Sequence, residues 1–157
     1  MPVNARDLQA FAKNLCAADA SEVTLRASAS RAYYAAFHAV LPFAEKLPAS
    51  SIEQRGATHL SHTEMGRRLR EWHVGGVSPK LQGMNVTGAQ LAMSIRALRL
   101  TREVADYRLG AKLSFNEATQ QIERARTVLS KMLQIQAMLE RSNANLTSAP
   151  LEPTENA

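Results

Sequence analysis

The segment that follows Ser114 constrains the fold most, because its apolar residues recur every three or four positions as far as about residue 141. The apolar positions are Ala118, Ile122, Ala125, Leu129, Met132 and Ile135. That spacing places them on one face of an α-helix. Ser114 and Glu117 have the spacing of a capping box, so we expect the helix to begin there. A helix this long with one apolar face must bury that face, which predicts a bundle of helices.

Four more segments have helical spacing, and no segment shows the alternation of a strand. These predicted helices cover about 4–18, 20–46, 60–73 and 88–109. The residues expected to cap them are Asn4, Asp19 with Glu22, Ser61 with Glu64, and Thr87. We expect Pro42 to kink the second helix or to end it early. The stretches LPASSIEQRGAT and VGGVSPKLQGMNVTG have the composition of loops.

The predicted fold is an all-α, up-and-down bundle of about five helices over residues 1–142. A polar, aperiodic tail over 143–157 is expected to be disordered. The chain of 157 residues is long enough for one domain, and its single cysteine, Cys16, excludes an intramolecular disulfide. The N-terminal segment lacks the apolar stretch of a secretory signal, and no apolar run approaches the roughly 20 residues of a membrane span. We therefore expect a cytoplasmic protein without membrane contact.

Positive charge is concentrated in the middle of the chain. Residues 55–112 hold ten Lys/Arg and only four Asp/Glu, whereas the remaining residues are nearly balanced. Such a concentration suits a polyanion-binding surface, although solvated helix faces carry similar runs. The candidate nucleic-acid contacts are Arg67, Arg68, Arg70, Arg96 and Arg99. A helix-turn-helix DNA-binding protein would fit this charge, but no short turn joins two compact helices of the recognition type.

The motifs of several enzyme classes are absent from the sequence. It has no Gly-rich phosphate loop, no H-E-x-x-H and no E-x-x-H pair of the di-iron bundles. Cys16 lies on an apolar helix face, where an inert buried thiol is expected. We therefore predict no cofactor and no metal site.

Arginine, tyrosine and histidine side chains recur on one predicted helix. Arg31, Tyr34 and His38 lie within two turns, so all three can share a face. An arginine can hold a phosphate, a histidine can transfer a proton and a tyrosine can orient either, which suffices for metal-free cleavage of RNA. A structural alternative is a buried Arg31–Asp106 pair, surrounded by Tyr34 and Tyr107.

Three motifs together resemble those of HEPN-domain proteins, in particular a short bacterial branch. The segment SRAYYAAFHAV resembles the signature S-R-x-Y-Y-A-x-F of that branch. A lone histidine follows, as His62 in SHTEMGRRLREW, and then R-x-x-A-D-Y, as Arg102 to Tyr107 in TREVADYRLG. The downstream pattern A-x-x-x-I-x-x-A is also present, and the similarity spans about residues 25–135.

This resemblance implies a helical bundle that usually forms a homodimer. In many members it also implies a metal-independent endoribonuclease, with a composite site at the dimer cleft and a role in toxin–antitoxin or anti-phage defence. The later motif here has Arg102 but no histidine at the expected spacing. Arg31 or Arg102 would therefore hold the phosphate of an RNA, and His38 or His62 would transfer the proton.

The resemblance leaves a second interpretation open, because other members are non-catalytic adaptors that bind RNA, a nucleotide or a partner protein. The partners expected for either interpretation are RNA, a second copy of the chain, and a nucleotidyltransferase-type antitoxin or a larger defence effector.

Overall fold

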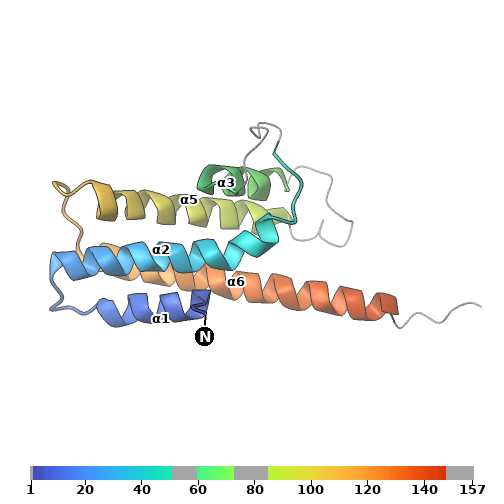
Figure 1. The fold of residues 1–157 in the computed structure, drawn as a ribbon, viewed down its shortest axis with the longest axis horizontal. Coiled ribbons are helices and arrows are strands. Elements are labelled where there is room, and N and C mark those ends of the chain that lie inside the picture. The colour runs from blue at the N-terminus through green and yellow to red at the C-terminus, as the bar shows by residue number, and fades with distance from the viewer. Residues whose placement is uncertain (1, 51–59, 73–84, 148–157) are drawn as a thin grey trace, which may run out of the picture.

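The computed structural model describes residues 2–50, 60–72 and 85–147, which form five α-helices and no strand (Figure 1). The helices are α1 (Ala5–Leu15), α2 (Glu22–Ala44), α3 (His62–Glu71), α5 (Asn85–Tyr107) and α6 (Phe115–Thr147). The predicted all-α bundle is therefore confirmed. In Figure 1, α1 and α2 run in opposite directions, as do α5 and α6, and α3 lies on the outer side of α5.

Helix α2 is the centre of the bundle and packs against each of the other four helices. Ser28, Ala29, Ala32 and Ala36 are fully buried on it. These small side chains let neighbouring helices approach α2 from several sides. Because it is buried on most sides, α2 lacks the single apolar stripe of a surface helix.

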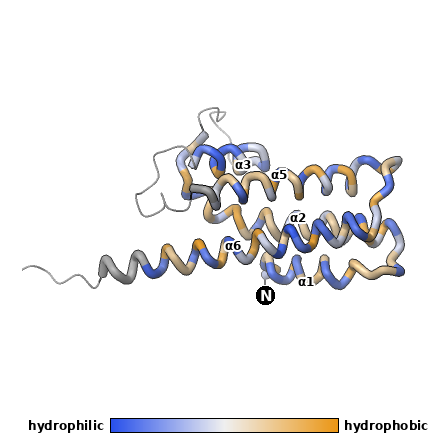
Figure 2. Tube along the Cα trace, turned by 180° about the vertical axis from the view of Figure 1, so that it is seen from behind, coloured by the Kyte–Doolittle hydropathy of each residue, from blue (hydrophilic) through white to orange (hydrophobic). Residues whose placement is uncertain are grey.

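The sequence predicts no membrane span, and the hydropathy along the helices bears on that prediction. Figure 2 shows hydrophilic and hydrophobic positions interspersed along the helices. Within the described ranges, no helix combines the length and the apolar character that crossing a membrane requires.

Two predicted caps are confirmed in full. Asn4 Oδ1 accepts the N–H of Asp7 at 3.0 Å, and Asp7 Oδ2 accepts the N–H of Asn4 at 3.0 Å. Ser114 and Glu117 form the same reciprocal pair, at 3.2 Å and 2.7 Å, at the start of α6. Each box satisfies N–H groups that have no partner inside the helix.

Other predicted helix ends are wrong. Ser21 caps α2 in place of Asp19, since the Ser21 hydroxyl accepts the N–H of Thr24 at 3.3 Å. Helix α5 begins at Asn85, so Thr87 lies inside it. By contrast, α2 ends at Ala44, close to its predicted end, and Pro42 lies inside it and does not end it early.

The C-terminal helix is longer than predicted. Helix α6 continues to Thr147, so residues 143–147 belong to a helix and not to the predicted tail. Residues 148–157 lie outside the described part of the chain, as do most residues of the two predicted loops.

A buried arginine that the sequence did not suggest joins α2 to the end of α5. Arg26 is 8% exposed and donates to the main-chain carbonyls of Val104 at 2.9 Å and Ala105 at 3.1 Å. It also donates to the carbonyl of Ala111 and pairs with Glu22 at 2.8 Å. The side chain thus supplies further donors to carbonyls in and just after the last turn of α5, and it fixes the end of α5 against α2.

Candidate functional site

The candidate site lies where α2, α3 and α5 meet, and its central side chain is Arg102 of α5. Nη2 of Arg102 donates to the hydroxyls of Tyr34 at 2.8 Å and Tyr107 at 3.0 Å. Its Nε lies 2.7 Å from Oδ2 of Asp106, one helical turn further along. The guanidinium carbon is 5.9, 5.4 and 4.9 Å from the ring centres of Tyr33, Tyr34 and Tyr107, within the range of cation–π contact. Arg102 is therefore held in one orientation by three rings and a carboxylate.

His62 reaches the same junction from the first turn of α3. Its Nδ1 shares a hydrogen bond with the hydroxyl of Tyr33. The ring of Phe37 lies beside the imidazole, with 4.3 Å between the ring centres. These two contacts from α2 fix the plane of the imidazole and occupy one of its two nitrogens.

The surroundings of His62 disfavour its charged form. Burial lowers the pKa of His62, and the positive charges of Arg102 and Arg99 and the nearby His38 lower it further. Burial also raises the pKa of the Tyr33 hydroxyl that bonds to it. Near neutral pH the site thus holds a neutral imidazole beside a protonated tyrosine.

Most of the predicted catalytic and orienting residues come together here. Tyr34, His62, Arg102, Asp106 and Tyr107 share the junction through the contacts described above. Six residues separate His38 from Arg31, as the sequence shows. The exposed ring of His38 lies 6.3 Å from that of Tyr34 in a stacked arrangement, so His38 borders the cluster.

The hypothesis of a buried Arg31–Asp106 pair is wrong. Arg31 is exposed, whereas Asp106 forms its ion pair with Arg102 and accepts a hydrogen bond from the hydroxyl of Ser30 at 3.1 Å. Arg102 and Asp106 stand four residues apart on one helix, where side chains meet without help from the tertiary fold. Arg31 follows Ser30 on α2 and is turned outward.

Three of the predicted nucleic-acid contacts lie on α3. Arg67 and Arg68 lie close to Glu64, whereas Arg70 lines a cavity. Arg68 bonds to Glu64 at 3.1 Å and to the carbonyls of Ala44, the last residue of α2, and Leu47 just beyond it, and its side chain is 12% exposed. Arg68 therefore joins α3 to the segment that follows α2, and we assign it this structural role in place of a nucleic-acid contact. Arg67 lies 3.9 Å from the same Glu64.

Glu64 did not form the capping box predicted with Ser61. The Ser61 hydroxyl does accept the N–H of Glu64 at 3.1 Å. The carboxylate, however, accepts from the N–H of Ser50 at 2.9 Å and from its hydroxyl at 2.6 Å, in addition to Arg68. Glu64 is 7% exposed, so these donors satisfy a buried charge.

The other predicted contacts surround a cavity between α3 and α5. Arg70 comes from α3, and Arg96 and Arg99 come from α5. Arg99 donates to the hydroxyl of Thr63 at 3.0 Å and lies 3.3 Å from Glu103. His62 also lines this cavity, so it borders both the cavity and the cluster around Arg102.

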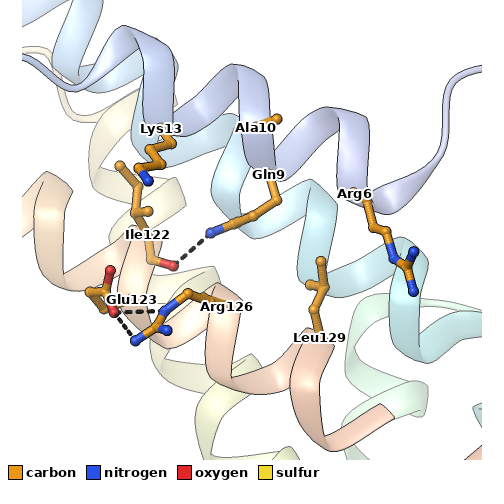
Figure 3. A pocket seen from close by; sticks show the side chains of 8 residues that line it. All are labelled: Arg6, Gln9, Ala10, Lys13, Ile122, Glu123, Arg126 and Leu129. Carbon is orange, nitrogen blue, oxygen red and sulfur yellow. Dashed lines mark hydrogen bonds and ion pairs between the residues drawn. The ribbon is translucent and has the colours of Figure 1, made fainter. Parts of the chain in front are cut away.

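A larger cavity of about 500 Å³ lies between α1 and α6 (Figure 3). In that view Gln9 reaches the carbonyl of Ile122 at 2.9 Å, and Arg126 is turned toward Glu123 at 2.6 Å. No histidine or aromatic residue lines it. We therefore place the candidate site at the α2–α3–α5 junction.

Sequence reasoning gave no role to several residues of the site. Ser30 holds Asp106, Thr63 accepts from Arg99, and Glu103 pairs with the same arginine. Tyr33 could have been found from its position directly before Tyr34 in the first motif. Nothing in the sequence points to Ser30 or Thr63, because their hydroxyls reach Asp106 and Arg99 only when the helices are packed together.

No protein-family model, curated protein or solved structure matches this chain. Among the residues that the structure describes, no group of three or more His, Cys, Asp or Glu side chains could hold a metal ion. The chemistry available at the junction is that of a fixed guanidinium, a neutral imidazole, tyrosine hydroxyls and an exposed second histidine.

Proposed function

We propose that this chain is a HEPN-type protein that cleaves RNA without a metal ion, in a bacterial toxin–antitoxin or anti-phage defence setting. The observation that carries the proposal is the meeting of Arg102 and His62 with three tyrosines at one helix junction. Both residues belong to the sequence motifs that resemble the HEPN signature, and they come from different helices.

Arg102 is suited to hold the phosphate. Tyr34, Asp106 and Tyr107 outweigh the effect of burial and raise the pKa of Arg102, so it remains charged. Its Nη1 makes no hydrogen bond within the described part of the chain, whereas Nη2 donates to two tyrosine hydroxyls and Nε lies against the carboxylate of Asp106. In the proposed reaction Nη1 donates to the phosphate oxygens and offsets the charge that builds in the transition state.

His62 is suited to act as the general base. When Nδ1–H of His62 donates to the hydroxyl oxygen of Tyr33, Nε2 carries the lone pair and can accept the proton of a ribose 2′-hydroxyl. The 2′-oxygen then bonds to the adjacent phosphorus, and the bond from phosphorus to the 5′-oxygen breaks. His38 donates a proton to that leaving oxygen. The products are a 2′,3′-cyclic phosphate and a 5′-hydroxyl, with no water or metal consumed.

A homodimer would complete the proposed site. Met93, Leu100 and Tyr107 are exposed at seven-residue steps along α5, so they form one apolar stripe that ends at the Arg102 cluster. A second copy packed on this stripe would bring two such clusters together. The nucleotidyltransferase-type antitoxin or larger effector, and the cytoplasmic location, remain predictions from the resemblance.

A non-catalytic adaptor is the second candidate function, and one observation favours it. Arg102 already has three polar partners, and His62 is paired with Tyr33, so much of the cluster is satisfied by the protein itself. Such a cluster can present a fixed binding surface without transferring a proton.

Cleavage of RNA in excess EDTA by the purified protein distinguishes the two functions. The variants are His62→Ala and Arg102→Met, and the control is Arg126→Met, which removes an exposed arginine on α6. The nuclease proposal predicts that each site variant lowers the cleavage rate by about 100-fold or more while the control retains it. If folded protein leaves RNA intact but binds it, and His62→Ala binds equally well, the adaptor function replaces the nuclease.

A further inference from the structure

The cavity between α3 and α5 is a basic site separate from the Arg102 cluster. It has a volume of about 230 Å³ and is lined from both helices. Arg70, Arg96 and Arg99 supply three guanidinium groups, and no carboxylate lines the cavity. Thr63 adds a hydroxyl near the start of α3.

The positive charge of this cavity is only partly neutralised. Arg99 lies 3.3 Å from Glu103, which offsets one of the three charges. Arg70 and Arg96 are exposed, and neither forms an ion pair with another residue of the described ranges. Two guanidinium groups thus face the cavity with their donors free to bind an anion.

The start of α3 adds to this preference for an anion. His62 and Thr63 are the first two residues of the helix and both line the cavity. The first N–H groups of a helix have no partners inside it, and the helix dipole favours negative charge there. The same end of α3 therefore contributes to both neighbouring sites.

We propose that the α3–α5 cavity binds a phosphate monoester, carried either by the 5′ end of an RNA or by a free mononucleotide. A phosphate monoester carries about −1.5 to −2 charges at pH 7 and matches the fork of an arginine. The cavity is smaller than the roughly 300–1,000 Å³ of sites for drug-sized ligands, so it suits one phosphate-bearing unit. Ala92 and Ile95 form an apolar wall against which a sugar can pack.

Binding of the 5′ end of an RNA rests on the proposed function, whereas binding of a phosphate monoester as such does not. A 5′-phosphate held here would place the following nucleotides near His62, which borders both sites. The cavity would then set where the strand lies relative to the Arg102 cluster.

Calorimetric titration with four probes tests the proposal. The probes are AMP, a 2′-O-methyl tetranucleotide with a 5′-phosphate, the same tetranucleotide with a 5′-hydroxyl, and a tetraglutamate peptide. We expect AMP or the 5′-phosphorylated strand to bind at least about tenfold more tightly than the 5′-hydroxyl strand and the peptide. Preference for the phosphorylated strand over AMP assigns the RNA end, and the reverse assigns a mononucleotide. Equal binding of all four probes overturns the proposal.

Two kinds of variant locate the binding. Arg96→Gln removes one free guanidinium, and Gly66→Leu fills the cavity from α3, where a Cβ has no heavy atom within 4 Å. Each is expected to weaken binding of the phosphate probe by about tenfold or more, whereas Arg124→Gln on α6 leaves this affinity unchanged. Wild-type affinity in both cavity variants overturns the proposal.

The outcomes separate this site from the nuclease. If the cavity variants lose binding of the phosphate probe while Arg102→Met, at a residue that does not line the cavity, keeps it, the cavity site stands whether or not the protein cuts RNA. If RNA is cut but no probe discriminates the phosphate, the nuclease stands and the cavity site fails.

Discussion

Gly88 lies where α5 passes close to Trp72, the C-cap residue of α3, and replacing Gly88 with alanine forces the two helices apart. A Cβ at Gly88 would meet Cε3 of Trp72 far inside contact distance and the main-chain oxygen of Leu69 at 2.9 Å. Neither neighbour can move freely. Trp72 is 4% exposed and its ring lies 5.1 Å from that of Phe43, while the Leu69 oxygen belongs to the backbone of α3.

The magnitude follows by comparison with Gly66, which lies on α3 and where an added Cβ meets no heavy atom within 4 Å. Gly66→Ala is expected to stabilise the protein by about 1 kcal/mol through helix propensity alone. Gly88→Ala gains a similar amount, but overpacking costs about 1–3 kcal/mol. The two variants should therefore differ in unfolding free energy by about 1–3 kcal/mol, with Gly88→Ala the less stable.

Thermal and urea unfolding followed by circular dichroism measure this difference. For a protein of this size 1 kcal/mol shifts Tm by about 2–4 °C, so Gly66→Ala should melt above the wild type and Gly88→Ala several degrees below Gly66→Ala. Because Gly88 sets the distance of α3 from α5, Gly88→Ala should also weaken any activity that needs His62. A Gly88→Ala variant as stable as Gly66→Ala would refute the close contact and the placement of α3 derived from it.

Three further predictions concern single side chains. Arg26→Met removes charged hydrogen bonds to the end of α5 and should lower the unfolding free energy by about 2–3 kcal/mol; a change below about 0.5 kcal/mol in urea unfolding would contradict that role. NMR titration should find the pKa of His62 below its ordinary value, and Arg102→Met should raise it, since a positive charge is lost; an unchanged value would place Arg102 too far away. Because the unfolded chain binds that proton at higher pH than the folded one, His62 makes stability fall as pH drops below about 6.5, and this contribution should shrink in Arg102→Met. For cleavage of RNA, Tyr33→Phe should lower kcat and leave KM nearly unchanged, because it frees Nδ1 of His62 without removing a ligand contact. An effect on KM alone would argue against a positioning role for Tyr33.

The helices could be predicted from the sequence because their determinants are local. Apolar spacing located all five described helices, and the capping boxes at Asn4 and Ser114 depend on residues three apart. A predicted helix cap was wrong where two nearby residues both satisfy the capping rule. Asp19 and Ser21 are both good caps, and only the path of the chain into α2 selects Ser21.

The site was predictable as a set of residues but not as a set of contacts. The motifs supplied Tyr34, His62, Arg102, Asp106 and Tyr107, which do lie together. Their pairing depends on how each helix is rotated about its axis, and sequence spacing does not determine that rotation.

The two arginines outside that set show the same limit. Arg31 is turned to solvent, although it stands beside a residue that contacts the site. Arg68 reaches carbonyls at the end of α2, a contact between segments more than twenty residues apart. A charged residue in a basic stretch therefore cannot be assigned to a ligand or to the fold from composition alone.

Analysis of RNA ends after incubation in EDTA tests the central claim most directly. The substrates are one RNA and its fully 2′-O-methylated form, which offers the same phosphates but no 2′-hydroxyl. The account predicts that the RNA is cut to 2′,3′-cyclic phosphate and 5′-hydroxyl ends, that the methylated strand stays intact, and that His62→Ala abolishes cleavage. Intact RNA with folded protein, or equal cleavage of the methylated strand, would contradict it.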